Sequence, residues 1–266
     1  MKLFTQLITA SFLIVATFTG CHAKKQKNLI KVGVSAGREA DLMETVAKIA
    51  KEKYDLTVVA IPFSDYATPN VALNDGSLDV NAFQHKPYLE AQNHDRGFHL
   101  VVVGNTFVYP IAGYAKKIKQ LSELSDRAKV AIPNDPTNLG RALLLLQKEG
   151  LITLKPDIDL EPTALDIVGN PKNLQIIELE AAQIPRSFED VDLAIINSTY
   201  AAEINLLPTR DGLFVEEKDS PYVNIIAARQ ENKDEKKIQD FVKAYQTEEV
   251  FQKANKLFEG NVVKGW

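Results

Sequence analysis

The stretch Leu29–Ile61, LIKVGVSAGREADLMETVAKIAKEKYDLTVVAI, decides the fold class that the sequence predicts. An apolar strand over Leu29 to Ser35 is followed by a helix from Gly37 to about Tyr54, and a second strand covers Leu56 to Ile61. This order of strand, helix and strand predicts parallel neighbouring strands with the helix packed on the sheet. The helix has one regular apolar face, formed by Leu42, Val46 and Ile49.

The same alternation continues along the rest of the chain and predicts an α/β protein with parallel sheets. Further strands are expected over Leu78–Phe83, Leu100–Val103, Lys129–Ile132, Leu174–Leu179, Leu193–Asn197 and Tyr222–Ala228. Further helices are expected over Pro69–Leu73, Pro87–Gly97, Asn138–Glu149, Thr199–Ile204, Lys233–Gln246 and Glu248–Phe258, with a short one near Leu121–Leu124.

The length of the chain favours two lobes, because a typical domain has about 100–150 residues. The segment Gly104–Ala115, which is extended and contains Pro110, is expected to cross to a second lobe, and the strand Tyr222–Ala228 is expected to bring the chain back. We therefore expect residues 29–108 and 226–266 to form the first lobe and residues 109–225 the second. Ligands of open α/β sheets bind at the carboxyl ends of the strands, which here predicts a cleft between the lobes.

The first 28 residues are expected to lie outside this fold. Lys2, an apolar run to Phe18 and small residues before Cys21 are typical of a bacterial export signal over residues 1–20. Cys21 is the only cysteine and directly follows Thr19 and Gly20, so we expect it to be acylated and to anchor the exported protein in a bacterial membrane. The alternative is a cysteine that follows a cleavage site by chance. Residues 21–28 would form a lipidated N-terminus and linker.

Charge and motif content exclude several classes of function. The formal net charge of −4, with both signs mixed along the chain, gives no electrostatic footprint for nucleic acid. The histidines lack the spacing of metal ligands, and the chain has no loop of the Walker or dinucleotide-binding type. We therefore expect no metal and no cofactor.

One motif offers an enzymatic alternative. Residues 33–37, GVSAG, match the G-x-S-x-G pattern in which Ser35 would be the nucleophile of a hydrolase. All four histidines lie before residue 100, whereas hydrolases of this type use a histidine late in the chain. We expect instead that this glycine-rich turn lines a ligand cleft and that the protein is not an enzyme.

The stretch Val130–Arg141 predicts a site for a carboxylate. A strand ends at Ile132, polar residues follow, and a helix begins at Asn138 with Arg141 in its first turn. Backbone N–H groups at a helix start bind anions, and an arginine adds a planar fork suited to a carboxylate. The alternative is a capped helix with a surface arginine.

Aromatic and amide residues at other strand ends predict the remaining walls. Tyr66, Phe83, His85 and Tyr88 would surround an apolar or thioether side chain, since sulfur contacts aromatic rings favourably. The alternative places Phe83 in the core and His85 in an ordinary loop. Asn197 and Asn224 interrupt apolar strands and could fix an amino group and a carboxylate, although a turn role at a strand end is also open.

Five long motifs and the terminal KGW together resemble one known family: NAFQHKPYL, VVGNTFVYPIAGY, VAIPNDPTNLGRALLLLQ, NPKNL and SPYVN. They are similar to the methionine-binding lipoproteins of the NlpA type, from about Lys31 to Trp266. The resemblance implies a two-lobed, type II-like periplasmic-binding-protein fold that closes on its ligand. It also implies that Arg141, with Asn138 nearby, holds the ligand carboxylate, that Asn197 and Asn224 secure the head group, and that the aromatic residues surround the side chain.

The function that the resemblance implies is capture of L-methionine and its delivery to the permease and ATPase of an ABC importer. D-Methionine, a methionine-containing dipeptide or another apolar amino acid remain alternatives, because one methylene contributes only about 1–3 kcal/mol of discrimination. A surface adhesin is a further alternative that no residue supports. We expect a monomer that faces the periplasm or the cell exterior.

Overall fold

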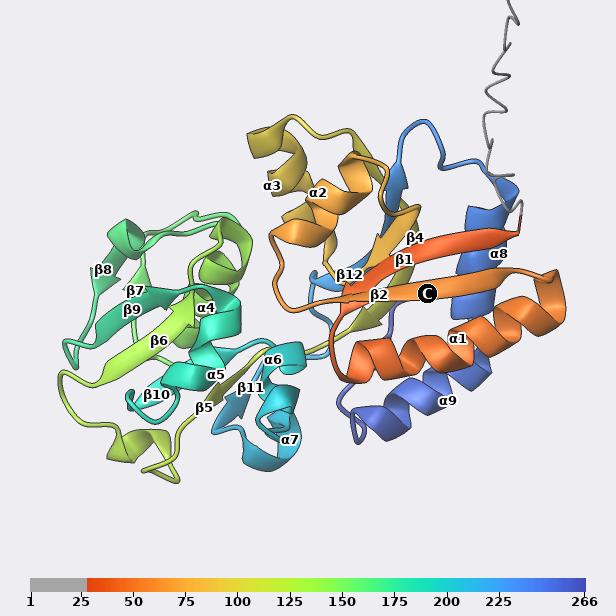
Figure 1. The fold of residues 1–266 in the computed structure, drawn as a ribbon. Helices are drawn as coiled ribbons and strands as arrows, with labels where there is room; N and C mark the ends of the chain where they lie inside the picture. Colours follow the sequence, from red (N-terminus) through yellow and green to blue (C-terminus); the bar gives the residue numbers. More distant parts are fainter. Residues whose placement is uncertain (1–27) are drawn as a thin grey trace, which may run out of the picture.

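A computed structural model of the chain describes residues 28–266 and has two lobes, each built around its own β-sheet (Figure 1). The predicted two-lobed α/β architecture is therefore confirmed. The predicted signal peptide, Cys21 and the linker as far as residue 27 lie outside the described residues. Within residues 28–266, no helix is both long and apolar enough to cross a membrane.

The first lobe contains a six-stranded sheet in the order β13-β4-β12-β3-β1-β2. β1 (Leu29–Ser35) and β2 (Thr57–Phe63) are parallel, and α1 (Arg38–Tyr54) connects them, which confirms the βαβ unit predicted from the opening stretch. The other elements of this lobe are β3 (Val80–Ala82), β4 (Leu100–Val108), β12 (Val223–Arg229), β13 (Val263–Lys264), α2 (Thr68–Asn74), α3 (Lys86–Arg96), α8 (Lys236–Tyr245) and α9 (Glu248–Leu257).

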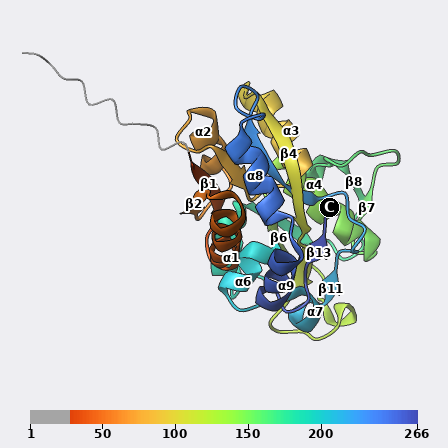
Figure 2. The same ribbon diagram turned by 90° about the vertical axis from the view of Figure 1, so that its right-hand side faces the viewer.

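Helices cover both faces of this first sheet. α1, α8 and α9 lie together on one face, where Leu42 of α1 and Phe241 of α8 belong to one buried apolar cluster (Figure 2). On the other face, Leu73 and Leu89 from α2 and α3 pack with Ile225 of β12. A sheet that is buried on both faces needs apolar residues at consecutive positions, which is why these strands are nearly continuous apolar runs.

The second lobe contains a five-stranded sheet in the order β11-β5-β10-β6-β9. Its central strands alternate between two cores: Val130 and Ile132 pack in the cluster that includes α4, and Ala131 packs in the cluster on the opposite face. The elements are β5 (Ala112–Tyr114), β6 (Lys129–Pro133), α4 (Pro136–Lys148), β9 (Gln175–Leu179), α5 (Ile184–Ser187), β10 (Leu193–Ile196), α6 (Ser198–Glu203), α7 (Pro208–Asp211), β11 (Phe214–Val215) and a small ribbon of β7 (Thr153–Leu154) and β8 (Ile167–Gly169).

The expected parallel strand pairs are present in both lobes, but each sheet also contains antiparallel pairs. β12 runs antiparallel to β3 and β4, and β5 runs antiparallel to β10. The chain leaves the first lobe along β4 and re-enters it along β12, so these two neighbours must run in opposite directions. Val223 at the start of β12 lies opposite Val108 at the end of β4, which places the two crossovers beside each other.

Several element boundaries differ from the predicted ones. The strand expected over Leu100–Val103 continues to Val108, because its pairing with β12 and β13 continues past Gly104. The first crossover is therefore confined to residues 109–111. The segment expected as a helix near Leu121–Leu124 is one turn of 3-10 helix over Leu121–Glu123. The short elements β5, β7, β8, β11, β13, α5 and α7 were not predicted.

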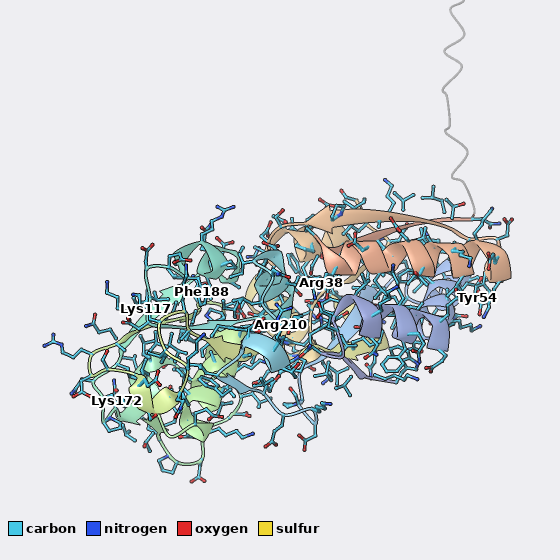
Figure 3. All side chains as sticks on the ribbon, turned by 90° about the horizontal axis from the view of Figure 1, so that it is seen from below. Arg38, Tyr54, Lys117, Lys172, Phe188 and Arg210 are labelled. Carbon is cyan, nitrogen blue, oxygen red and sulfur yellow. The ribbon has the colours of Figure 1, made fainter. Side chains whose placement is uncertain are left out.

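The lobes also touch outside the two crossovers. The backbone N–H of Thr209, in α7, donates to Asn261 Oδ1 at 3.0 Å, and Arg210 lies 3.8 Å from Glu259 at the end of α9. Seen from below, Arg210 lies in the middle of the molecule, between the second lobe and the helices of the first (Figure 3). The C-terminal part of the chain therefore contributes to the contact between the lobes.

Candidate ligand-binding site

A partly open cavity lies between the lobes and is lined by residues from both lobes and from the first crossover. All eight residues predicted for the ligand site line it: Tyr66, Phe83, His85, Tyr88, Asn138, Arg141, Asn197 and Asn224. Four further lining residues were not predicted: Gln84, Tyr109, Ser198 and Thr199. The structure thus brings the whole predicted set to the lining of one cavity.

An aromatic cluster forms the wall on the side of the first lobe. The ring centroid of Phe83 lies 5.8 Å from that of Tyr66 and 6.1 Å from that of Tyr88. Tyr88 Oη donates to the carbonyl oxygen of Tyr66 at 2.9 Å. Burial raises the pKa of Tyr88 above its ordinary value, so its hydroxyl stays protonated. The wall is apolar and uncharged.

Buried amides hold the segment that carries this wall. Asn70 Nδ2 donates to Gln84 Oε1 at 2.8 Å, and Gln84 Nε2 donates to Asn81 Oδ1 at 2.9 Å. Asn224 Nδ2, in β12, donates to the carbonyl oxygen of Phe83 at 3.2 Å. Because buried amides are costly when unpaired, these bonds fix the backbone between β3 and α3.

His85 caps α3 and remains neutral. Its Nδ1 accepts from the backbone N–H of Tyr88 at 3.1 Å, so the neutral ring carries its proton on Nε2, which lies 3.3 Å from Asn138 Oδ1. Burial, and secondly the positive charge of Arg141, lower the pKa of His85 to about 3. The ring therefore donates to Asn138 across the cleft and adds no charge at neutral pH.

Asn138 and Asn197 connect this ring to the second lobe. Asn138 Oδ1 also accepts from Asn197 Nδ2 at 2.8 Å, and Asn138 Nδ2 donates to Asp135 at 3.0 Å. Asn197 Oδ1 is buried and has no hydrogen-bond partner among the described residues. Since an unpaired buried acceptor is costly, this oxygen is available to a donor that enters the cavity.

The helix start does not match its predicted role. α4 begins at Pro136 rather than Asn138, and the Asp135 carboxylate caps it by accepting from the backbone N–H of Asn138 at 3.0 Å. A carboxylate already occupies the helix N-terminus, so the expected anion site of free backbone N–H groups is wrong. Because α4 begins two residues earlier than expected, Arg141 lies in its second turn rather than its first. Burial raises the pKa of Asp135.

Arg141 is buried, and three of its five N–H donors are already engaged. Nε donates to Glu216 Oε1 at 2.8 Å, and Nη2 donates to Glu216 Oε2 and, at 3.0 Å, to the carbonyl oxygen of Tyr109. The guanidinium also lies over the ring of Tyr222, 4.5 Å from its centroid. The predicted fork is therefore filled by Glu216, and the two N–H groups of Nη1 remain for a ligand.

The Ser35 motif is explained by packing. Ser35 and its flanking glycines are absent from the cavity lining, so the expectation that this turn lines the cleft is wrong. A Cβ at Gly33 would lie 2.5 Å from Leu78 Cδ1, and Gly37 has φ of 75° where it precedes α1. Ser35 is buried beside Glu39, whose pKa burial raises to about 7. In residues 28–266, no three His, Cys, Asp or Glu side chains are grouped to hold a metal ion.

Residues 30–266 match the protein family described as NlpA lipoprotein. Over 250 residues the chain is 59% identical to a protein of Escherichia coli (strain K12) named D-methionine-binding lipoprotein MetQ, with 93% of this chain and 92% of that protein covered. A nutrient-binding protein from Burkholderia cenocepacia bound to methionine is similar in structure, with a TM-score of 0.87 and 48% identity over 89% of this chain and 100% of that one. A periplasmic substrate-binding protein of an ABC transporter from Coxiella burnetii has a TM-score of 0.86 and 47% identity over the same shares of the two chains.

Proposed function

The chain belongs to the NlpA lipoprotein family, and from this premise we propose that it is a non-catalytic receptor that captures methionine for an ABC importer. One observation supports this most directly: the cavity between the lobes has an aromatic wall on one side and, on the other, an arginine whose two Nη1 N–H groups have no hydrogen-bond partner within residues 28–266. The combination suits a small zwitterion with an apolar, polarisable side chain. The family relatives named above for methionine support the same ligand.

Each part of methionine has a complementary group in the cavity. The carboxylate would accept from Nη1 of Arg141, in a charge-assisted hydrogen bond. The ammonium would donate to the unpartnered Asn197 Oδ1. The thioether would contact the rings of Tyr66, Phe83 and Tyr88, because sulfur interacts favourably with aromatic rings. His85 is neutral and does not repel the ammonium.

L-Methionine is the proposed ligand, and D-methionine is a second candidate because the Escherichia coli relative is named for the D-enantiomer. The two enantiomers carry the same carboxylate, ammonium and thioether, so the cavity offers the same partners to both. They differ in where the side chain points once the head group is held. Discrimination therefore depends on the distance between the aromatic wall and the pair of Arg141 and Asn197.

Delivery requires a transporter and a place in the membrane. We propose that acylated Cys21 anchors the exported monomer, with residues 22–28 as a tether, and that the closed protein docks on the permease of an importer driven by its ATPase. The Coxiella burnetii relative, described as part of an ABC transporter, supports this partner. Closure of the lobes on the ligand would give the permease a means of distinguishing loaded from empty receptor.

Titration calorimetry of the chain from residue 22 tests the proposal. We expect L- or D-methionine to bind with a Kd of about 1 μM or lower and norleucine, which lacks sulfur, to bind more weakly. A methionine-containing dipeptide and leucine complete the panel, and denaturing mass spectrometry of the purified protein identifies any ligand retained from expression. If neither enantiomer binds and no amino acid is released, the proposal is wrong.

A further inference from the structure

Glu216 is a carboxylate that pairs directly with Arg141, a residue of the cavity lining, although sequence patterns did not single it out. It follows β11 on the way to the second crossover and pairs with Arg141 through both of its oxygens. The side chains of Arg141 and Glu216 are 4% and 13% exposed, so water screens this pair little. Two buried charges are tolerated only when they pair with good geometry. The burial of Arg141 therefore depends on Glu216, and the burial of Glu216 depends on Arg141.

The backbone of Glu216 is fixed by the first crossover. Its N–H donates to the carbonyl oxygen of Ile111 at 2.9 Å, which continues the antiparallel pairing of β11 with β5. Glu216 Oε2 lies 3.4 Å from the backbone N of Ile111. Glu216 therefore connects residues of both crossovers with an arginine that lines the cavity.

This arrangement leaves the guanidinium one orientation. Glu216 holds Nε and Nη2, the carbonyl oxygen of Tyr109 holds Nη2, and the ring of Tyr222 covers one face of the plane. Only the Nη1 edge is left for the ligand. An arginine without this support would keep its charge but would lose its fixed direction, because its side chain has several rotatable bonds.

We infer that Glu216 is the positioning residue of the carboxylate site: it holds the guanidinium of Arg141 so that the Nη1 edge faces the ligand's α-carboxylate. The inference rests on the proposed function for the identity of the ligand. The positioning itself is a property of the protein and is measurable without a ligand.

Glu216→Gln tests the inference, with Glu217→Gln as the matched control. Glu217 is the next residue and pairs with Lys148 at the surface, its side chain being 67% exposed. Calorimetry compares methionine with methioninamide, which lacks the carboxylate. We expect Glu216→Gln to weaken methionine binding about tenfold or more and to reduce the preference for methionine over methioninamide by the same factor, because glutamine offers only one acceptor. Glu217→Gln should match the parent.

A merely structural role would weaken both ligands equally and leave the preference unchanged, and that result would overturn the inference. Adding Glu216→Gln to Arg141→Ala should cause no further loss of methionine binding, since the two residues then act through one contact. An additional tenfold loss in the double variant would also contradict the inference.

A ligand-free measurement separates this inference from the proposed function. The Arg141 Nε–H resonance, identified by its absence in Arg141→Lys, should exchange slowly with solvent in the parent and in Glu217→Gln. It should exchange at least tenfold faster in Glu216→Gln. Unchanged exchange would overturn the positioning role, whereas a parent that does not bind methionine would overturn only the proposed function.

Discussion

The aromatic wall of the cavity and its charged side differ in how they are assembled. Apart from Tyr66, the wall comes from one short segment that runs from the end of β3 into the first turn of α3, and neutral amides such as Asn70 and Gln84 hold it. The charged side joins Arg141 of α4 to Glu216, which lies 75 residues away, and to the carbonyl oxygen of Tyr109 in the first crossover. The wall is held by neutral contacts of the first lobe, among them the amide of Asn224 in β12, whereas the charged side joins the second lobe to the first crossover.

This difference predicts how substitutions on each side affect ligand binding. Loss of one ring removes some contact area, and neighbouring rings can still exclude water. Loss of one charge leaves its buried partner uncompensated, which is among the more costly changes in a protein interior. We therefore expect variants of the charged side to weaken binding most and variants of the aromatic wall mainly to change specificity.

Arg141→Ala should have the largest effect. Removing one partner of a buried charge pair costs about 2–5 kcal/mol, so methionine binding should weaken roughly 30-fold to 3,000-fold. The variant should also unfold at lower denaturant concentration, because Glu216 loses its partner. Calorimetry and denaturant titration measure the two effects. Lys148→Ala, at the exposed C-terminal end of the same helix, is the control and should bind as the parent does. Equal loss in both variants would contradict the comparison.

Asn197→Ala comes next, because it removes an uncharged acceptor from the same side. A hydrogen bond to a charged group contributes about 1.5–3 kcal/mol, so we expect methionine binding to weaken roughly 10-fold to 150-fold. The affinity for N-acetylmethionine, which has no ammonium, should fall much less in this variant. Asn255→Ala on α9 is a control far from the cavity. If N-acetylmethionine lost as much as methionine in Asn197→Ala, the oxygen would not be the ammonium partner.

Sequence patterns found the aromatic wall more completely than the charged side for a physical reason. Tyr66, Phe83, His85 and Tyr88 follow strand ends, and the carboxyl ends of neighbouring strands meet at one edge of a sheet. Arg141 was predicted from its position near a helix start that follows a strand end, but its partner Glu216 was not predicted. Chain length and charge give no preference for Glu216 over the other acidic residues, since their pairing depends on how the crossovers fold.

The βαβ unit was predictable for a similar reason, and the sheet directions were not. The apolar period of Leu29–Ile61 is local and defines β1, α1 and β2. Whether β12 enters between β3 and β4 depends on where the second crossover brings the chain back, which no local pattern encodes. The strands β11 and β5 are also too short to predict from a local pattern. Their pairing fixes the backbone of Glu216 against Ile111, which only the folded structure shows.

The neutral state of His85 gives the next prediction, which concerns the junction of the two sides. The pKa of His85 is about 3 in the folded protein and about 6.5 when unfolded, so only the unfolded chain takes up this proton between these values. The free energy of unfolding should therefore fall as the pH falls from 6.5 towards 3, by up to about 1.4 kcal/mol per pH unit from this residue. Denaturant titrations at pH 7 and pH 5 should show a smaller fall for His85→Gln than for the parent. Equal falls would show that His85 accepts its proton in the folded state as well.

Phe83→Leu should have the smallest effect and should change specificity more than affinity. Leucine keeps an apolar surface against Tyr66 and Tyr88 but removes the ring that a thioether would contact. Contacts between sulfur and an aromatic ring contribute about 0.3–1.5 kcal/mol, so methionine binding should weaken roughly 2-fold to 12-fold while norleucine, which has a methylene in place of sulfur, loses less. The ratio of the two dissociation constants, measured by calorimetry in parent and variant, isolates the ring from general packing loss. A loss as large as that of Arg141→Ala, shared equally by both ligands, would mean that the wall and the charged side fail together and that the lobes close as one unit.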